Sequence, residues 1–511
     1  MIRFKIKLAV RNLLKNKVYS FLIIGGFAIG FTATILIGLF YNVETNVDKH
    51  FTNYKNIFRL YDAKKNKAEL DYKLHTVLSE NYPDIKKACP VGFSYFPTTL
   101  KDPETKNYIR IEHVLTTNNS FFDVFSIKPS STLGKQPFSQ HNSAVISQSA
   151  AKKLFGDENP LGRTIEEEFF TATVTAVIDD LPENSSFKAD LLLYSENEDY
   201  QMSQECNNGI CIYPSEHVLL LKNGVNPDEL ATNLNSSIGK FNTTTDSLAL
   251  QNLSNIYLST LDLGWTDSHF KGNSKMLLIF LAIGILIILL SSINYLNYTL
   301  SIQYAKMKEI GINKTNGAEK SHLLADSLIE VTLGIFIALL LSILLVTLLI
   351  QSTGILFGKE IHLEDVNLQQ LLPVFAGIIA GIIILNSLAP IYILSKFNIS
   401  DFLSGGRKKT GRQFGKQAML IFQLTVSIAL ITVVMLIFKQ LQYVKHHDLG
   451  FNEEHLVRIE LPYFENQKTL KNEISKLPFV TNSTLSEGYP GHINWQMGSG
   501  IEGDEFTVKC I

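Results

Sequence analysis

Five long apolar runs constrain the fold of this chain more than any other feature of its sequence. Each run is as long as the roughly 20 residues that a helix needs to cross a bilayer. Hydrophobic residues make up 46% of the chain and charged residues 18%, which is too apolar for a wholly soluble protein and too polar for one buried entirely in lipid. The sequence therefore predicts an α-helical membrane protein with an additional soluble part. The runs are Val18–Tyr41, Lys275–Leu300, Leu328–Ile350, Leu371–Leu394 and Ala418–Phe438.

The first run follows a basic segment and is too long to be the core of a signal peptide. Residues 1–17 contain six Lys and Arg residues and no acid. A signal peptide has an apolar core of roughly 7–15 residues followed by a small-residue cleavage site. We therefore predict that the first run is an uncleaved transmembrane helix. Small residues along it predict close packing against another helix, and these are Gly25, Gly26, Ala28 and Gly30.

Residues 42–273 contain no run that could span a membrane, and their pattern predicts a mixed α+β domain. Asn226–Phe241 has the pattern of a helix, with Asn226 as its cap and Pro227 at its first position. Ser147 is the predicted cap of a second helix that ends at Phe155. The predicted strands are Ile57–Tyr61, Ala144–Ile146, Thr164–Glu168, Thr171–Ile178 and His217–Lys222, and the segment LPENSS at 181–186 is a predicted turn.

The distribution of basic residues predicts the orientation of the chain in the membrane. With five spans, the segments 1–17, 301–327 and 395–417 lie on one side, and all three are rich in Lys and Arg. The loop between the third and fourth runs has one Lys against three acids. Because Lys and Arg are enriched in cytoplasmic loops, we predict a cytoplasmic N-terminus. The domain at 42–273 and the segment 439–511 are then outside the cytoplasm.

Polar residues inside the apolar runs have a structural explanation. Asn294, Asn297, Asn386 and Gln423 lie in or near the ends of the second, fourth and fifth runs. Polar side chains in lipid usually face other helices, so we predict interhelical hydrogen bonds in preference to a substrate site.

The fifth run resembles the start of a second copy of the first unit. Each begins with a basic segment and an apolar run, followed by a short polar stretch and a candidate strand: NVDKHFTNYKNIFRLYD after the first and KHHDLGFNEEHLVRIEL after the fifth. On this pattern the chain ends inside a second soluble domain, in a predicted strand, FTVKCI. We therefore expect an incomplete second unit.

The sequence shows no recognisable motif for nucleotide binding, metal binding or catalysis. A nucleotide site needs a glycine-rich loop followed by Lys and Ser or Thr, and neither GKE at 358–360 nor GKQ at 415–417 fits that pattern. The segment LSGGR at 403–407 is similar to the LSGGQ signature of ABC ATPases, and we interpret it as a chance match in a basic loop. The histidines and carboxylates show no metal-binding or catalytic spacing. Net charge is −2, and the basic segments have no interleaved aromatics, which argues against a nucleic-acid partner.

The cysteines leave one question open. Cys206 and Cys211 are close enough in sequence to form a disulfide in an oxidising compartment, or to remain two free thiols in a loop.

The segment Lys306–Glu330, between the second and third runs, has the pattern of a short helical hairpin. Gly311 and Gly317 allow the chain to reverse, and Asn316 with Glu319 forms a capping box for the helix that continues into the third run. The pattern fits equally an ordinary basic loop and a contact through which a partner moves two membrane helices.

At these residues the sequence resembles a known family. KMKEIGINKTNGAEK resembles the KxxEIGIRKxxGA segment of the MacB/FtsX-like ABC transporter permeases, which contacts a separate ATPase subunit. RNLLKNKVYSFLIIGGFAIG resembles the family's first helix, while AVISQSAAKKLFGDENPLGRTI and LPENSSFKADLLL resemble its periplasmic core domain. FGKQAMLIFQLTVSIALI resembles the start of the second half in duplicated, eight-span members of the Bacteroidetes type.

The resemblance implies a set of contacts and partners. The ATPase contact would consist of Lys308, Glu309, Ile310, Gly311, Gly317 and Ala318. Asn313 and Asn316 depart from the family pattern, which usually has Arg and an apolar residue there. ATP and Mg²⁺ would bind the partner ATPase, so the chain itself would hold no cofactor and would not be an enzyme. A periplasmic adaptor and a second permease are further implied partners, and residues 275–400 would form the FtsX-like permease domain in a bacterial inner membrane.

Two functions follow from different readings of the sequence. In the first, ATP hydrolysis on a partner drives the periplasmic domain, for export, lipoprotein extraction or mechanotransmission. In the second, the chain is a membrane-anchored receptor or scaffold whose outer domain binds a ligand or partner without ATP. Association with an ATPase would distinguish them. The sequence does not identify a substrate.

Overall fold

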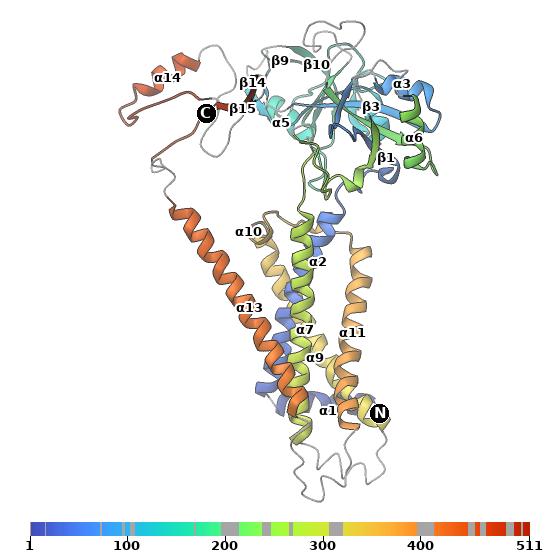
Figure 1. Cartoon of the computed structure of the whole chain (residues 1–511), viewed down its shortest axis with the longest axis vertical. Helices are drawn as coiled ribbons and strands as arrows, with labels where there is room; N and C mark the ends of the chain where they lie inside the picture. The colour runs from blue at the N-terminus through green and yellow to red at the C-terminus, as the bar shows by residue number, and fades with distance from the viewer. Residues whose placement is uncertain are drawn as a thin grey trace, which may run out of the picture.

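The structure is a computed structural model of the chain (Figure 1). The residues that it describes are 2–15, 17–71, 74–94, 98–102, 108–167, 170–195, 214–237, 247–264, 269–305, 320–395, 413–447, 455–459, 467–486, 495–501 and 504–510. The molecule is elongated, with a soluble domain at one end and a bundle of long helices at the other (Figure 1).

Five of the described helices are long and apolar enough to cross a membrane, as the sequence predicted. They are α2 (Lys17–Thr45), α7 (Ser274–Ala305), α9 (Lys320–Leu349), α11 (Leu368–Ser395) and α13 (Gln413–His446). Together with the soluble domain, they confirm the predicted fold class. Helix α13 continues beyond the predicted end of the fifth run at Phe438, because Lys439, Gln440 and Gln442 are good helix formers that extend it past the apolar part.

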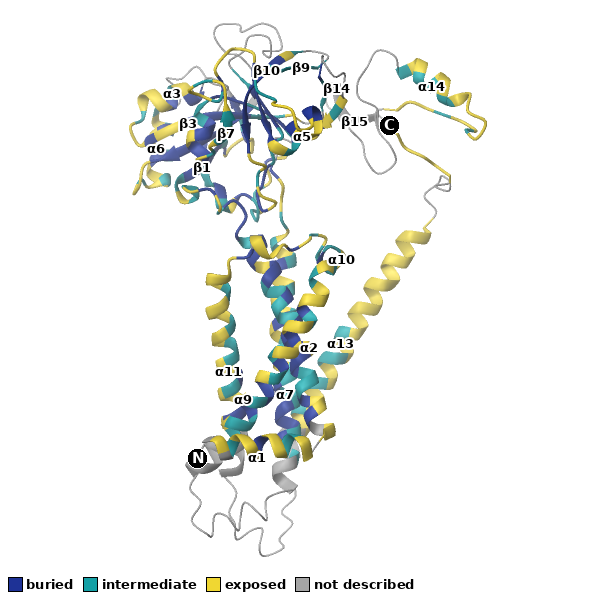
Figure 2. Ribbon diagram, turned by 180° about the vertical axis from the view of Figure 1, so that it is seen from behind, coloured by how far each residue is buried: buried dark blue, intermediate teal, exposed yellow. Residues whose placement is uncertain are grey.

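Helix α2 occupies the centre of the bundle and packs against both α7 and α9. Helix α11 contacts α9 and α7, whereas α13 contacts α7 and leans away from the other helices toward its C-terminal end (Figures 1 and 2). Apolar side chains of α2, such as Phe27, Phe31 and Leu39, are buried among those of its neighbours. The helix that contains the first apolar run is therefore the core of the bundle.

Two glycines set the closest approaches to α2. A Cβ atom on Gly30 would lie 2.6 Å from the Ser291 Oγ atom of α7, and one on Gly38 would lie 2.7 Å from the Phe375 ring of α11. Gly26 also contributes, because its carbonyl accepts a hydrogen bond of 3.3 Å from Ser291. Gly25, in contrast, faces open space. The predicted role of the small residues therefore holds for Gly26 and Gly30 but not for Gly25.

Polar residues in the bundle form contacts between helices. Asn386 is fully buried in α11 and donates a hydrogen bond of 3.4 Å to Ser292 of α7 and another of 2.9 Å to its own helix at Ile382. This confirms the predicted interhelical role of Asn386. Asn297 is buried in α7, but its side-chain amide has no hydrogen-bond partner among the described residues, so the interhelical hydrogen bond predicted for it is not found.

Residues 2–15 form a helix that the sequence analysis did not predict. The helix α1 (Ile2–Lys15) lies across the end of the bundle farthest from the soluble domain and packs on α9 and α2 (Figure 1). It was overlooked because the basic residues of this segment were interpreted only as an orientation signal.

Thirteen strands of the described residues form one continuous sheet in the soluble domain. The order is β13-β1-β12-β3-β6-β11-β8-β10-β9-β4-β5, with β2 paired to β12 and β7 paired to β10. The strands are β1 (Ile57–Asp62), β2 (Glu69–Asp71), β3 (Ile85–Phe93), β4 (Thr98–Lys101), β5 (Tyr108–Ile111), β6 (Val114–Thr117), β7 (Pro129–Thr132), β8 (Ser143–Ser147), β9 (Thr164–Glu166), β10 (Thr171–Ile178), β11 (Leu191–Tyr194), β12 (Pro214–Leu221) and β13 (Leu248–Asn252).

Short helices cover this sheet and bury its apolar side chains. They are α3 (Leu74–Asn81), α4 (Ser120–Phe125), α5 (Gln148–Phe155) and α6 (Pro227–Ser237). Most strand pairs are antiparallel, but β8 pairs parallel with β10 and β6 pairs parallel with β11. A connection between parallel strands needs a crossover, and α5 lies between β8 and β10 in the chain. The buried side chains fall into three apolar clusters along the sheet.

Two predicted helix caps and two predicted strands in the soluble domain are confirmed. Ser147 caps α5 by accepting a hydrogen bond from the Ala150 amide, and Asn226 accepts one from the Asp228 amide at the start of α6. The predicted strands Thr164–Glu168 and Thr171–Ile178 are present as the antiparallel pair β9 and β10. These elements form where sequence spacing and turn chemistry already determine them.

The described residues after α13 form only small elements. They include α14 (Gln467–Ser475) and an antiparallel hairpin of β14 (Trp495–Ile501) and β15 (Asp504–Cys510). The candidate strand expected after the fifth run is wrong for 455–459, which have no regular structure. A strand needs a partner for its backbone groups, and no described strand lies beside this segment.

The packing of α2 leads to a first prediction. Gly30→Val is expected to lower the free energy of unfolding by about 1–3 kcal/mol, because the added methyl groups would force α2 away from Ser291. Thermal unfolding of the detergent-purified chain measures this effect. Gly25→Val is the matched control, with the same substitution in the same helix, and it should unfold close to the wild type because Gly25 faces open space. Equal losses in both variants would contradict the packing argument.

Candidate functional site

The residues predicted to contact an ATPase lie outside the described residues. Lys308, Glu309, Ile310, Gly311, Gly317 and Ala318 fall between the end of α7 at Ala305 and the start of α9 at Lys320. Cys206 and Cys211 also lie outside the described residues. The ATPase contact and the disulfide therefore stay predictions, and the site that the structure does describe is the junction between the bundle and the soluble domain.

The soluble domain is inserted between α2 and α7, so both of these helices connect to it directly (Figure 1). After α2 ends at Thr45, a connection of turns through residues 46–56 leads to β1, near one end of the sheet. After β13, which pairs with β1, the chain returns to the start of α7 at Ser274. The junction consists of these two connections and the loops that pack around them.

Asp48 holds the first connection in place. It is fully buried and has a φ of 63°, in the left-handed region that side chains other than glycine rarely adopt. Its amide donates to the Asn184 carbonyl at 3.0 Å, and its carboxylate accepts a 2.8 Å hydrogen bond from the Ser186 amide. Burial raises the pKa of Asp48, and the hydrogen bonds from Ser186 and the charge of His269 offset part of that rise.

His269 holds the second connection, just before α7. Its Nδ1 atom lies 2.8 Å from the Ser186 hydroxyl, and its Nε2 atom lies 2.8 Å from the Glu216 carboxylate. A carboxylate only accepts hydrogen bonds, so Nε2 carries a proton. Nδ1 accepts from the Ser186 hydroxyl when the ring is neutral and donates to it when the ring is charged. The loop at 184–186 therefore contacts both connections, Asp48 on one side and His269 on the other.

Arg59 extends this network into the sheet. The second carboxylate oxygen of Glu216, on β12, lies 3.4 Å from a guanidinium nitrogen of Arg59 on β1. Arg59 also donates a 2.6 Å hydrogen bond to Gln251 on β13. Arg59, Glu216 and His269 are each at most 2% exposed at their side chains, so three neighbouring strands and both connections share one buried polar network.

Such a network is costly to bury. Moving an ion pair out of water loses hydration energy that the attraction between the charges often fails to restore. Removing one partner, however, leaves the other charge buried without compensation. The arrangement therefore stabilises one geometry of the junction strongly, relative to geometries in which any of its contacts is broken.

Aromatic side chains pack beside the network. Phe187 follows directly after Ser186, and its ring stacks with Phe51 at 5.9 Å and contacts the His269 ring at 5.7 Å. Phe125 contacts both phenylalanines. The segment LPENSS and the residues after α2 thus meet in space, although the sequence analysis interpreted LPENSS only as a turn.

A second polar contact lies in the last turn of α2. Glu44 is 5% exposed and lies 3.2 Å from the Lys359 ammonium, which belongs to the loop between α9 and α11. The Tyr257 hydroxyl donates to the same carboxylate at 2.9–3.0 Å. Burial, followed by the charge of Glu44, raises the pKa of Tyr257. This contact ties the loop from the bundle to the segment that returns from the sheet.

The same loop packs on α2 through its aromatic side chains. Phe357, at the end of α10 (Thr353–Phe357), stacks on Phe40 at 4.6 Å, and both rings contact Phe280 of α7. The Asn367 amide donates to the Asn42 side chain at 2.8 Å. The upper end of the bundle is therefore held together by the last turns of α2.

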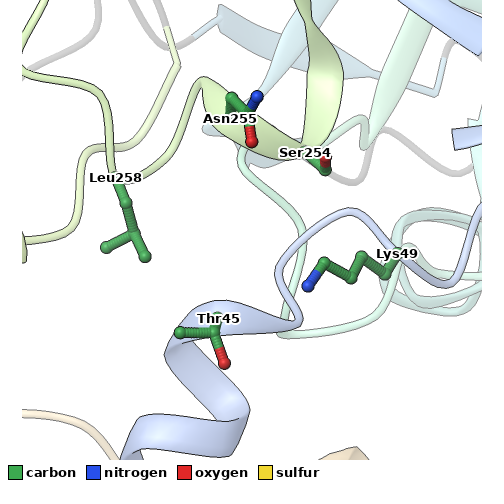
Figure 3. A pocket seen from close by; sticks show the side chains of 5 residues that line it. All are labelled: Thr45, Lys49, Ser254, Asn255 and Leu258. Carbon is green, nitrogen blue, oxygen red and sulfur yellow. The ribbon is translucent and has the colours of Figure 1, made fainter. Parts of the chain in front are cut away.

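A cavity of about 440 Å³ opens beside the end of α2. Figure 3 shows Lys49 extending into the space that it encloses with Thr45, Ser254, Asn255 and Leu258. Burial lowers the pKa of the Lys49 ammonium. No group of His, Cys, Asp or Glu that could hold a metal ion is found among the described residues. Among the described residues that line the cavity, Lys49 is the one cation and none is a carboxylate.

Sequence reasoning missed the network because its members are scattered from residue 48 to residue 269. Each one taken alone is an ordinary polar residue in a turn or strand. One signal was available: Arg59 lies among apolar residues in IFRLYD and Glu216 comes just before the apolar run VLLL, and a charge in a buried strand usually has a partner. His217, the next residue on β12, is fully buried and stacks on His75 with ring centres 5.8 Å apart.

The family comparison adds to this geometry. Residues 20–236 match the model of the MacB-like periplasmic core domain. This chain carries a MacB-like periplasmic core domain. The match begins within α2 and includes Asp48, Arg59, Ser186 and Glu216. Most of α2 and most of the junction therefore belong to the matched region. The resemblance to MacB-like ABC permeases drawn from the sequence motifs is confirmed.

Three solved structures resemble part of this chain. A domain of a permease protein from Porphyromonas gingivalis is 20% identical, with a TM-score of 0.35, over 42% of this chain and 94% of that chain. The periplasmic region of MacB from Actinobacillus actinomycetemcomitans is 16% identical, with a TM-score of 0.31, over 41% and 95%. The extracellular domain of the ABC-type transporter YknZ from Gram-positive bacteria is 15% identical, with a TM-score of 0.28, over 39% and 100%. No curated protein matches this chain.

The network at the junction leads to a second prediction. Glu216→Ala is expected to lower the free energy of unfolding by about 3–5 kcal/mol, because Arg59 would stay buried without its carboxylate. Thermal unfolding of the purified chain, followed by circular dichroism, measures the loss. The exposed ion pair of Lys87 and Asp123 provides the control, and Lys87→Ala should cost at most about 1 kcal/mol. If Glu216→Ala lowers the free energy of unfolding no more than the control does, the buried network does not stabilise the junction as proposed.

The raised pKa of Asp48 leads to a third prediction. A carboxyl group whose pKa is raised in the folded state binds its proton more tightly there, so stability falls as pH rises from 3.8 through the folded pKa. Asp48→Asn keeps an acceptor for the Ser186 amide and carries no charge. At pH 7 the variant should unfold at a higher temperature than the wild type, and the difference should shrink toward pH 4. A variant less stable than the wild type at pH 7 would indicate that the Asp48 carboxylate is net favourable.

Proposed function

We propose that this chain is the permease subunit of a MacB/FtsX-like ABC transporter, coupled to a separate ATPase. The family match supports a permease of an ABC-type transporter, a class whose permease subunits are not themselves enzymes. ATP and Mg²⁺ bind the partner ATPase on this proposal, and the chain contributes the contact at 306–319 and the helices on either side of it. An adaptor in the periplasm and a second permease are further partners of the assembly.

Helix α7 is the observation that carries this proposal. It is one unbroken helix of 32 residues, Ser274–Ala305, and at 1.5 Å per residue it is about 48 Å long. One end adjoins the predicted ATPase contact, and the other begins five residues after His269, which binds Glu216 on β12. A push on the first end therefore reaches the sheet through a stiff helix and a buried hydrogen bond.

Helix α2 provides a second path for the same motion. It packs along α7 and α9, the two helices that flank the predicted contact, and its C-terminal end leads to Asp48. Because both paths end on the loop at 184–186, a movement of the bundle displaces the domain as one body. The work done by such a movement is export, lipoprotein extraction or the mechanical control of another protein.

The proposed orientation leads to a fourth prediction. A chain in the bacterial inner membrane with a cytoplasmic N-terminus exposes Lys135 of the soluble domain to the periplasm and Lys15 of α1 to the cytoplasm. In a cysteine-free background, Lys135→Cys should react with a membrane-impermeant thiol reagent in cells whose outer membrane is permeable to it. Lys15→Cys should react only after the inner membrane is broken. The reverse pattern would overturn the proposed orientation.

The proposed contact leads to a fifth prediction. The purified chain should bind an ABC ATPase that has a P-loop and an LSGGQ motif, and it should change that enzyme's rate of ATP hydrolysis. Glu309→Ala combined with Gly311→Val should reduce the change in rate at least about tenfold, since one interfacial charge pair and one close approach are worth 1.4 kcal/mol or more together. Glu364→Ala, an exposed acid in the loop between α9 and α11, is the control.

The same experiment separates this function from that of a receptor or scaffold. A receptor would bind no ATPase, and its Glu309 and Gly311 variants would behave like the wild type. Binding of the ATPase with an unchanged response in the double variant would place the contact elsewhere in the chain.

A further inference from the structure

Helix α1 carries two parallel stripes of side chains with opposite properties. Arg3, Lys7, Arg11 and Lys15 follow each other at intervals of four residues, which places them on one face of the helix. Ile6, Val10 and Leu14 repeat at the same interval, one residue before each of the last three basic residues. The apolar stripe therefore runs alongside the basic stripe.

Neither stripe is covered by the rest of the protein. The four basic side chains are exposed and have no ion-pair partner among the described residues. Ile6 is 43% exposed, Val10 39% and Leu14 65%. Of the α1 side chains whose exposure the structure describes, only Ala9 is buried. The helix touches α9 and α2, but most of its surface faces away from them.

An isolated helix of this composition would be unstable in water. Its 14 residues are near the lower limit for helix formation. Like charges four residues apart repel each other, and α1 has three such pairs and no acidic residue to balance them. A surface that covers the apolar stripe and supplies negative charge would remove both costs.

The position of α1 identifies that surface. The helix lies across the bundle at the end opposite the soluble domain and is drawn largely in the colour of exposed residues (Figure 2). The candidate membrane span of α2 begins at Ser20, and the Ser20 hydroxyl donates a 2.7 Å hydrogen bond to the Leu13 carbonyl of α1. Helix α1 is thus attached at the level where the apolar part of the bundle begins, which is the boundary between hydrocarbon and headgroups.

We propose that α1 lies in the membrane interface and binds anionic phospholipid headgroups through Arg3, Lys7, Arg11 and Lys15. Ile6, Val10 and Leu14 enter the boundary of the acyl chains, as in other amphipathic helices that lie on membranes. Each basic residue near an anionic surface strengthens the attraction roughly fivefold. The surface is thus a lipid-binding site that is separate from the ATPase contact.

Hydrogen exchange of the α1 amides tests this proposal in the full chain. The purified protein is placed in nanodiscs of phosphatidylcholine alone or of phosphatidylcholine mixed with an equal part of phosphatidylglycerol. Exchange across 2–15 should be at least about tenfold slower over the anionic lipid. The difference should decrease when salt is raised, because salt screens charges at the surface. Equal exchange in both lipids would overturn the proposal.

Two variants with the same change in charge sharpen the test. Arg3→Gln, Lys7→Gln, Arg11→Gln and Lys15→Gln together should abolish the effect of phosphatidylglycerol, while glutamine keeps a good propensity for helix. Lys86→Gln, Lys128→Gln, Lys135→Gln and Lys152→Gln together remove the same charge from exposed positions of the soluble domain and should leave it intact. A lipid effect that persists in the α1 variant would refute the assignment. If exchange of the α1 amides slows only when the ATPase is added, and not when anionic lipid is present, the basic stripe would instead belong to a contact with a protein partner.

Discussion

Glu216 is the residue on which the connection between bundle and sheet depends. One oxygen of its carboxylate binds His269, next to the start of α7, and the other binds Arg59 on the neighbouring strand. Because all three side chains are shielded from water, no solvent molecule can take the place of a lost partner without opening the core. The junction therefore has one strongly preferred geometry, and the orientation of the domain follows from that of the helices.

Local patterns in the sequence predicted much of this fold. Apolar runs of sufficient length predicted the five long helices, and the alternation and caps around residues 144–178 predicted strands and a helix that are present. The limits of α2 and α13 were less predictable, because a helix continues past its apolar part when the next residues favour helix. Helix α1 was missed because its basic residues satisfied a simpler explanation, the asymmetry of charge between the two sides of a membrane.

The junction could not be predicted in the same way. Its partners come from six places along the chain, and no spacing relates Asp48 to Ser186 or Arg59 to Glu216. Only the folded sheet, with β1 beside β12, brings them together. The predicted ATPase contact at 306–319 is the opposite case, since its motif is local and legible in the sequence, whereas these residues lie outside the described residues.

The insertion of the domain between two packed helices restricts how it can move. Helices α2 and α7 lie side by side, and each carries one of the two connections to the sheet. The buried network holds both attachments in one geometry, so they resist a turn of the domain relative to the helices that carry it. A change in the angle between α2 and α7 therefore becomes a displacement of the far end of the soluble domain.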